Sequence, residues 1–209
     1  VFHMTWSAFL LTFFGWFGVA PLMPVIRDEL HLSKAQVANT VIASVAATIV
    51  VRLFVGVLCD RLGPRRTYAG LLMLGALPVM GIGLAHDYTT FLLFRLAIGG
   101  IGASFVITQY HTSVMFAPNV VGRAAATTAG WGNLGGGVAQ IVTPLLLSAF
   151  VSLGLSQALG WRLAMVVPGL LLFVWGILYA RLTVDGPRPA RGTKSLQTFL
   201  EAARDYRVW

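Results

Sequence analysis

Six long apolar runs constrain this chain more than any other feature of its sequence. A helix needs roughly 20 apolar residues to cross a bilayer, and each run approaches or exceeds that length. The runs lie at about 5–26, 35–58, 67–85, 90–115, 123–151 and 161–182. The strands of a membrane β-barrel are instead ~10-residue segments of alternating polarity. The runs therefore predict an all-α membrane protein with a six-helix transmembrane bundle over residues 1–182.

The charge of the chain is explained by its distribution around these runs. Hydrophobic residues make up 57% of the 209 positions and charged residues 11%, which excludes an ordinary soluble domain. The net charge of +8 therefore indicates membrane topology and not nucleic acid as a partner. Cations are concentrated on one side, which predicts that both ends of the segment are cytoplasmic. That side carries Arg61, Arg65, Arg66, Arg123, Arg181, Arg188, Arg191, Lys194, Arg204 and Arg207, against Arg27, Lys34 and Arg162 on the other. We expect the membrane to be the inner (plasma) membrane of the cell.

Arg52 is the most informative charge, because it lies inside a span. With Ser44, Thr48 and Gly56 it forms a stripe of residues four apart on an otherwise apolar run. Eight residues separate it from Asp60, or about 12 Å of helix, which places the guanidinium near the middle of the bilayer. A charge there costs roughly 2.5–3.5 kcal/mol, and no carboxylate lies within any of the six runs. We interpret Arg52 as the binding group for a permeating anion; the alternative is a side chain that reaches the inner interface.

The run at 123–151 contains an unusual stretch of five glycines and one amide at 130–137. Gly132 and Gly136 lie four residues apart on one face, as close approach between membrane helices requires. Asn133 adds a polar side chain at about the depth of Arg52. The stretch also fits G-x-G-x-x-G, but no strand precedes it and no acid follows about 20 residues on, so it does not predict a dinucleotide site. Helix packing alone and the lining of a polar path both remain open explanations.

A specific pattern occupies the short loop between the second and third runs. A loop selected only for positive charge would explain its arginines, but not its glycine and aspartate at fixed spacing. The pattern resembles the signature loop of the major facilitator superfamily, which lies between two helices on the cytoplasmic side. The resemblance implies a role in gating and conformational change for the matching positions. These are Gly56, Asp60, Arg61, Gly63, Arg65 and Arg66.

Within that superfamily, the chain resembles the nitrate/nitrite porters. Ala129–Gly137 followed by Gln140 is similar to the nitrate signature of that family, and Arg52 stands at the family's distance from Gly63. Members have twelve helices in two halves, so the resemblance implies that this chain is the N-terminal half. Residues 183–209 would then be the cytoplasmic linker between the halves, with an amphipathic interfacial helix over 193–208.

The same resemblance implies a substrate site. Arg52 would bind the anion, and Asn133 together with Gly132 and Gly136 would line its path. An aromatic residue of the first helix would complete the site, and Phe13 and Phe17 are equal candidates.

The implied function is secondary active transport of nitrate, with nitrite as a second candidate, by alternating access between two halves. The expected partners are the small inorganic anion, the lipid bilayer and the C-terminal half of the same transporter. Proton symport and nitrate/nitrite exchange both stay open. His111 is the candidate proton-linked group, because it is one of the few side chains within the runs that could titrate.

Three alternatives stay open, and two of them belong to other classes of function. The substrate could be another small anion, or the segment could be a non-catalytic membrane scaffold. A membrane enzyme would need acids, bases or metal ligands that face one cavity, and the sequence offers few. We therefore expect no catalytic residue, metal or cofactor.

Overall fold

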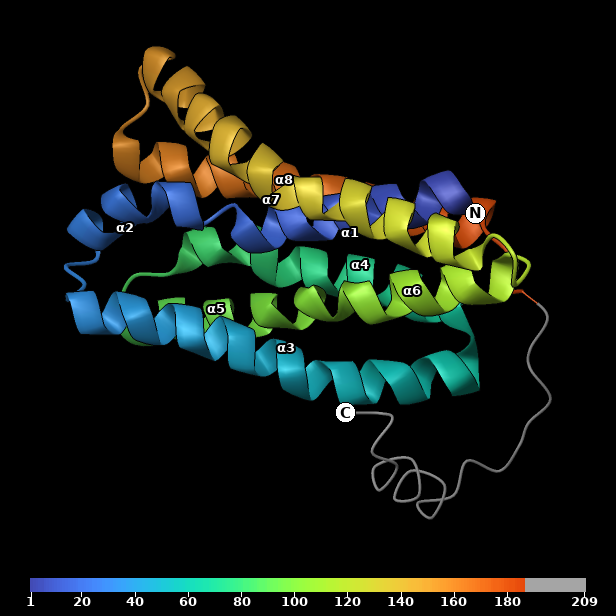
Figure 1. Ribbon diagram of the computed structural model, residues 1–209. Coiled ribbons are helices and arrows are strands. Elements are labelled where there is room, and N and C mark those ends of the chain that lie inside the picture. The colour runs from blue at the N-terminus through green and yellow to red at the C-terminus, as the bar shows by residue number, and fades with distance from the viewer. Residues whose placement is uncertain (187–209) are drawn as a thin grey trace.

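The computed structural model describes residues 1–186, and every regular element in that range is a helix (Figure 1). Six helical segments are long and apolar enough to cross a membrane, which confirms the predicted all-α, six-span fold. The helix predicted over 193–208 lies outside the described residues. In chain order the elements are α1 (Phe2–Phe17), η1 (Ala20–Leu22), α2 (Met23–Glu29), α3 (Lys34–Leu62), α4 (Pro64–Gly81), η2 (Ile82–Leu84), α5 (Tyr88–Gly99), η3 (Gly100–Ala103), α6 (Ser104–Met115), α7 (Val121–Ser152) and α8 (Gln157–Leu182), the η segments being 3₁₀ turns.

Two of the spans are interrupted by 3₁₀ turns within their length. The first passes from α1 through η1 to α2, where Pro21 and Pro24 lack the N–H that a continuous α-helix uses. The fourth passes from α5 through η3 to α6, whereas the sequence predicted one helix over 90–115. The interruption follows Gly99, where a Cβ would overlap the backbone of Ser44 on α3. Close approach of a second helix therefore accompanies this break.

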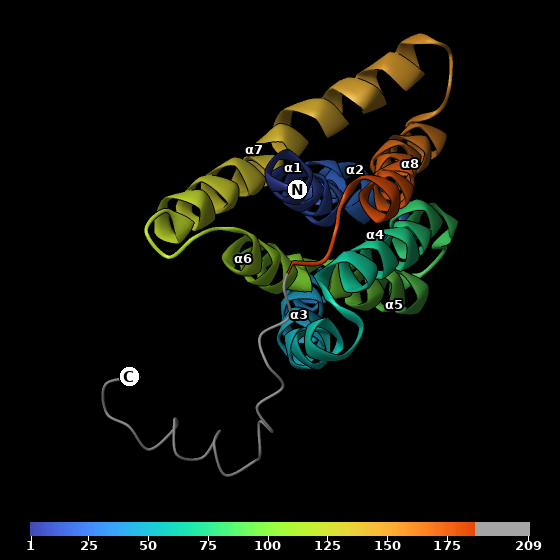
Figure 2. The ribbon, with the colours of Figure 1, turned by 90° about the vertical axis from the view of Figure 1, so that its right-hand side faces the viewer.

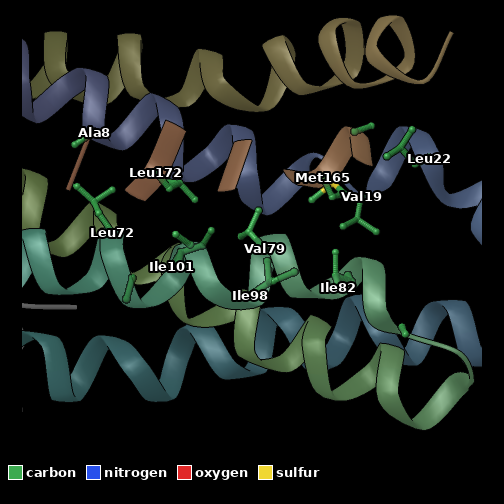
Figure 3. Packing of buried hydrophobic residues seen from close by; sticks show 14 of the residues in the cluster. Ala8, Val19, Leu22, Leu72, Val79, Ile82, Ile98, Ile101, Met165 and Leu172 are labelled. Atoms are coloured by element: carbon green, nitrogen blue, oxygen red, sulfur yellow. The ribbon is translucent and has the colours of Figure 1, made fainter. Parts of the chain in front are cut away.

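Helices α4 and α8 pack side by side and form the core together with α1. Two glycines of α8 permit this, because a Cβ at Gly169 would overlap Met80 and one at Gly176 would lie 2.7 Å from Met73 Cγ. In a bilayer such contacts stabilise helix association through van der Waals packing, since lipid is as apolar as the side chains. Fully buried side chains of this core, shown in Figure 3, are Ala8, Val19, Leu22, Leu72, Val79, Ile82, Ile98, Ile101, Met165 and Leu172.

Helices α3 and α7 differ from the other spans in how little of them is buried. In the end-on view of Figure 2 they lie on opposite sides of the bundle, with α1 and α6 between them. Both carry outward apolar side chains, among them Leu53 on α3 and Ile141 on α7. One face of the bundle is thus flanked by the two least buried helices.

An ion pair ties the elements together at one end of the bundle, here called the Glu29 end. Glu29, the last residue of α2, pairs with Arg162 of α8 at 2.5 Å and accepts a hydrogen bond from the indole of Trp161. Arg162 also donates to the carbonyl oxygens of Gly83 and Ala85, which follow α4. These contacts fix the exits of the first and third spans against the start of the sixth.

The opposite end, here called the Gly63 end, is closed by a residue that follows α8. Helix α4 begins directly after Gly63, which has no side chain to cap it. Asp185 replaces the missing cap, because its Oδ1 accepts a hydrogen bond from the Arg65 backbone N–H at 2.9 Å. The carboxylate also lies at the positive end of the α4 dipole. The chain that leaves α8 therefore completes the start of α4.

Candidate anion site

Arg52 lies on α3, ten residues before the helix ends at Leu62, and its side chain is exposed. Within residues 1–186 it has no hydrogen-bond or ion-pair partner. The members of the polar stripe predicted on α3 differ in their burial. Ser44 and Thr48 are buried, and Thr48 donates a hydrogen bond to the Gly99 carbonyl at 2.6 Å. Arg52 is turned out of this contact, since each four-residue step rotates the side chain by about 40°.

The glycines of α7 form a packed seam with α1. A Cβ at Gly132 would overlap the ring of Phe9, and one at Gly135 would overlap the carbonyl of Leu10. At Gly130 and Gly137, by contrast, a Cβ would meet no neighbouring atom within 4 Å. Close helix packing therefore explains Gly132 and also Gly135, which the sequence did not single out. The buried stripe of α7 consists of Ala124, Thr128, Gly132, Gly135, Ala139 and Thr143.

Asn133 and Gly136 lie on the sides of this seam. The Asn133 side chain is exposed, and its amide nitrogen donates to the Ala129 carbonyl at 2.8 Å within its own helix. A Cβ at Gly136 would lie 3.4 Å from Phe17, an ordinary contact. The structure thus brings Gly136 beside one of the two candidate rings of α1.

Five aromatic rings form a continuous cluster, which we call the aromatic wall: Phe9, Phe13, Trp16 and Phe17 of α1 and Phe105 of α6. Phe13 contacts Phe9, Trp16 and Phe17, with centroid separations of 4.4, 5.4 and 5.5 Å. Phe105 joins through Phe9 at 5.6 Å. Phe105 was not predicted from the sequence, because its place beside α1 depends on the packing of α6. Phe13 and Phe17 belong to one cluster, so both remain candidates.

Arg95 is another arginine within a span, and its environment differs from that of Arg52. Its side chain is only 6% exposed, and its guanidinium donates to the Trp16 carbonyl at 3.3 Å. The Arg95 Nε has no partner within residues 1–186. Arg95 therefore links α5 to the last turn of α1, where the helix gives way to η1.

His111 has protein partners at both ring nitrogens. Its Nε2 lies 2.9 Å from the Val184 carbonyl, which can only accept, so this nitrogen carries a proton. Nδ1 lies 2.6 Å from the Tyr179 hydroxyl, which donates to it when the ring is neutral. The neutral imidazole is thus fully satisfied and ties α6 to α8. Within residues 1–186 no group of three or more His, Cys, Asp or Glu side chains could hold a metal ion.

The signature loop lies at the Gly63 end. Gly63 has φ = 89°, a conformation that glycine adopts without strain, and a Cβ there would lie 2.7 Å from Asp185 Oδ1. The Arg65 guanidinium donates to the Ala180 carbonyl of α8. A Cβ at Gly56 would meet no neighbouring atom within 4 Å. The side chains of Asp60, Arg61 and Arg66 are exposed.

These spans define a multi-pass, α-helical membrane protein, and α3, one of its two least buried helices, carries an arginine that has no partner in residues 1–186. The profile of the Major Facilitator Superfamily matches residues 5–209, and the chain belongs to this family.

Curated relatives support the narrower resemblance to nitrate/nitrite porters. The nitrate/nitrite transporter NrtP of Nostoc punctiforme is 38% identical over 190 residues, which cover 90% of this chain and 37% of that protein. Nitrate transporter 2.1 of Chlamydomonas reinhardtii is 36% identical, covering 89% and 34%. High affinity nitrate transporter 2.7 of Arabidopsis thaliana is 37% identical, covering 91% and 38%. The chain thus spans little more than a third of the length of these relatives.

Solved structures agree on the fold. A bacterial homolog of the human lysosomal transporter Spinster, in an inward-facing and occupied conformation, superimposes with a TM-score of 0.75 at 18% identity. The match covers 98% of this chain and 47% of that one. The Escherichia coli xylose transporter XylE matches with a TM-score of 0.60 at 15% identity, over 90% and 49%. At these identities the similarity concerns the fold alone.

Proposed function

We propose that this chain belongs to a secondary transporter of nitrate and contributes Arg52 as the anion-binding residue. The observation that carries the proposal is the exposed guanidinium of Arg52, within a span and without a partner in residues 1–186. Such a charge is costly in a membrane unless an anion or water accompanies it. The relatives named as nitrate transporters supply the identity of the anion.

The chemistry of nitrate fits the groups that we propose for the site, which come from α1, α3, α6 and α7. Nitrate is planar and spreads one charge over three oxygens, so a guanidinium can donate two parallel N–H bonds to it. The aromatic wall offers ring surface on α1 and α6, and rings can hold a planar group without presenting acceptor atoms to it. Asn133 adds an exposed amide on α7. In this proposal Gly136 keeps the path beside Phe17 open, while Gly132 holds α7 against α1.

Transport requires the site to open to each side of the membrane in turn. We assign the Gly63 end to the cytoplasm of a plasma-membrane protein, because the excess of cations lies there. A C-terminal half would complete the site from the face flanked by α3 and α7, and the two halves would rock about the bound anion. The signature loop at Gly63 and Arg65 would move with this change.

The coupling ion is a separate part of the proposal. Proton symport and nitrate/nitrite exchange both fit a half with no carboxylate within its six apolar runs. His111 could contribute to symport only by exchanging one of its two hydrogen bonds, because both ring nitrogens are engaged. If it does, His111→Phe abolishes the acceleration of uptake by an inward proton gradient but leaves nitrate binding intact.

Nitrate uptake by the full-length protein in liposomes tests the proposal. Uptake of labelled nitrate that is inhibited by unlabelled nitrate and by nitrite, but not by chloride, would support it. Uptake of another anion in preference to nitrate would support the alternative substrate, and no uptake of any anion would favour a membrane scaffold. The segment 1–209 alone is expected to insert into the membrane without transporting.

A further inference from the structure

Trp16 lies where three helices meet. The substrate role proposed for the aromatic wall does not explain the hydrogen bonds that Trp16 makes there. It lies in the last turn of α1, just before the break at η1. Its indole Nε1 donates to the Ser44 hydroxyl of α3 at 2.8 Å, and its carbonyl accepts from Arg95 of α5. The side chain and backbone of one residue thus connect α1 to α3 and to α5.

The acceptor of the indole is held in place on its other side. Ser44 is 1% exposed, and its backbone lies so close to Gly99 that no Cβ fits between them. At Gly102 a Cβ would lie 3.1 Å from the Trp16 ring and 2.6 Å from the Thr48 hydroxyl. The indole therefore bonds to a point on α3 that cannot shift without moving η3.

The ring of Trp16 belongs at the same time to the aromatic wall. It contacts Phe13 and Phe17 with centroid separations of 5.4 and 4.9 Å. Ser44 lies eight residues before Arg52 on α3, or about 12 Å along the same rigid helix. One hydrogen bond thus joins the aromatic wall to the helix that carries the guanidinium.

We infer that Trp16 is a positioning residue, which sets the separation between the aromatic wall and Arg52 through its hydrogen bond to Ser44. The inference rests on the proposed anion site. Without the bond, α1 and α3 each keep their packing against the other helices, but the rings and the guanidinium no longer have one defined spacing. A small planar anion held from both sides then binds less tightly.

A double-mutant cycle in the full-length protein tests this inference. Trp16→Phe keeps the ring and removes the N–H, while Ser44→Ala removes the acceptor. Each is expected to weaken nitrate binding about fivefold, which corresponds to about 1 kcal/mol, the usual net value of a hydrogen bond. The double variant is expected to be no more than about fivefold weaker, because both changes break one bond. Independent, multiplying effects or unchanged affinities would overturn the inference.

Two controls separate positioning from general stability and from failure of the proposed site. Trp6→Phe removes an indole N–H that bonds to the exposed His3 on the same helix, so nitrate affinity should not change. The melting temperature of each purified variant is measured beside its affinity. A fall in melting temperature with normal nitrate affinity would show that Trp16 is only structural. If Arg52→Ala still binds nitrate, the anion site itself is wrong, whatever the result of the cycle.

Discussion

Arg52 and Arg95, two of the arginines within the spans of this chain, lie in contrasting surroundings. Arg95 is buried between helices and donates to a backbone carbonyl of α1, whereas Arg52 is exposed and has no partner within residues 1–186. Both side chains must be compensated, since an isolated cation is costly at membrane depth. The fold itself supplies part of the compensation for Arg95. Arg95 therefore contributes to the assembly of the bundle, whereas the compensation of Arg52 by a ligand is our proposal.

Replacement of Arg52 is expected to have the largest effect on function. Arg52→Ala should abolish specific nitrate binding without lowering the melting temperature, because the side chain makes no bond within residues 1–186. Arg52→Lys should weaken binding at least about tenfold, or ~1.4 kcal/mol, since an ammonium cannot donate two parallel bonds and is more strongly hydrated. Equilibrium nitrate binding to the purified full-length variants measures both effects. Near-normal affinity of the Lys variant would remove the two-bond argument, and near-normal affinity of the Ala variant would remove Arg52 from the site.

Arg95→Ala should show the opposite pattern. Loss of a large buried side chain leaves a cavity and an unpaired Trp16 carbonyl, which we expect to lower the free energy of unfolding by about 2 kcal/mol. The protein that remains folded should bind nitrate far better than Arg52→Ala does. Thermal unfolding in detergent and binding by the folded fraction check this. A stable Arg95→Ala variant that has lost nitrate binding would reverse the roles of the two arginines.

The glycine stretch of α7 allows the same contrast between packed and open positions to be tested. Gly132→Ala should destabilise the bundle by about 1–3 kcal/mol, because its Cβ would displace the Phe9 ring. Gly137→Ala is the matched control, with no neighbouring atom in the way, and should stabilise α7 by up to about 1 kcal/mol through higher helix propensity. Unfolding of the two variants under identical conditions gives the difference. Equal stabilities would mean that the α1–α7 seam is not tightly packed.

Two threonines of α6 provide the smallest test. The Thr108 hydroxyl lies 2.8 Å from the Tyr68 hydroxyl, whereas the buried Thr112 hydroxyl has no partner within residues 1–186. Thr108→Val should cost about 1 kcal/mol of stability, and Thr112→Val should be neutral or slightly stabilising. Melting temperatures of the two isosteric variants decide between these outcomes. A loss of stability at Thr112 would reveal a partner that residues 1–186 do not contain.

The sequence was sufficient to predict the spans, because hydropathy over about 20 residues depends on composition and not on tertiary contacts. It could not predict the break between α5 and α6. That break accompanies the close approach of the Ser44 backbone to Gly99, two residues that are far apart in the chain.

The candidate site was predictable in part, for a similar reason. Periodicity identified a polar stripe on α3, but only the packing shows that Ser44 and Thr48 are buried and Arg52 is not. Spacing treated Gly132 and Gly136 alike, although one is pressed against Phe9 and the other merely borders Phe17. The role of Phe105 in the aromatic wall depends on a contact between helices, which no local pattern reports.

The hydrogen bond from Arg65 to Asp185 also bears on the order in which the protein is made. Its two residues lie 120 positions apart, so the ribosome synthesises the start of α4 long before the carboxylate that caps it. Until the sixth span has entered the membrane, the first N–H groups of α4 must be satisfied by water or lipid headgroups. The bond can therefore form only after α8 and the residues that follow it have been made. A newly made chain that stops before Asp185 would carry all six spans but lack the carboxylate that caps α4.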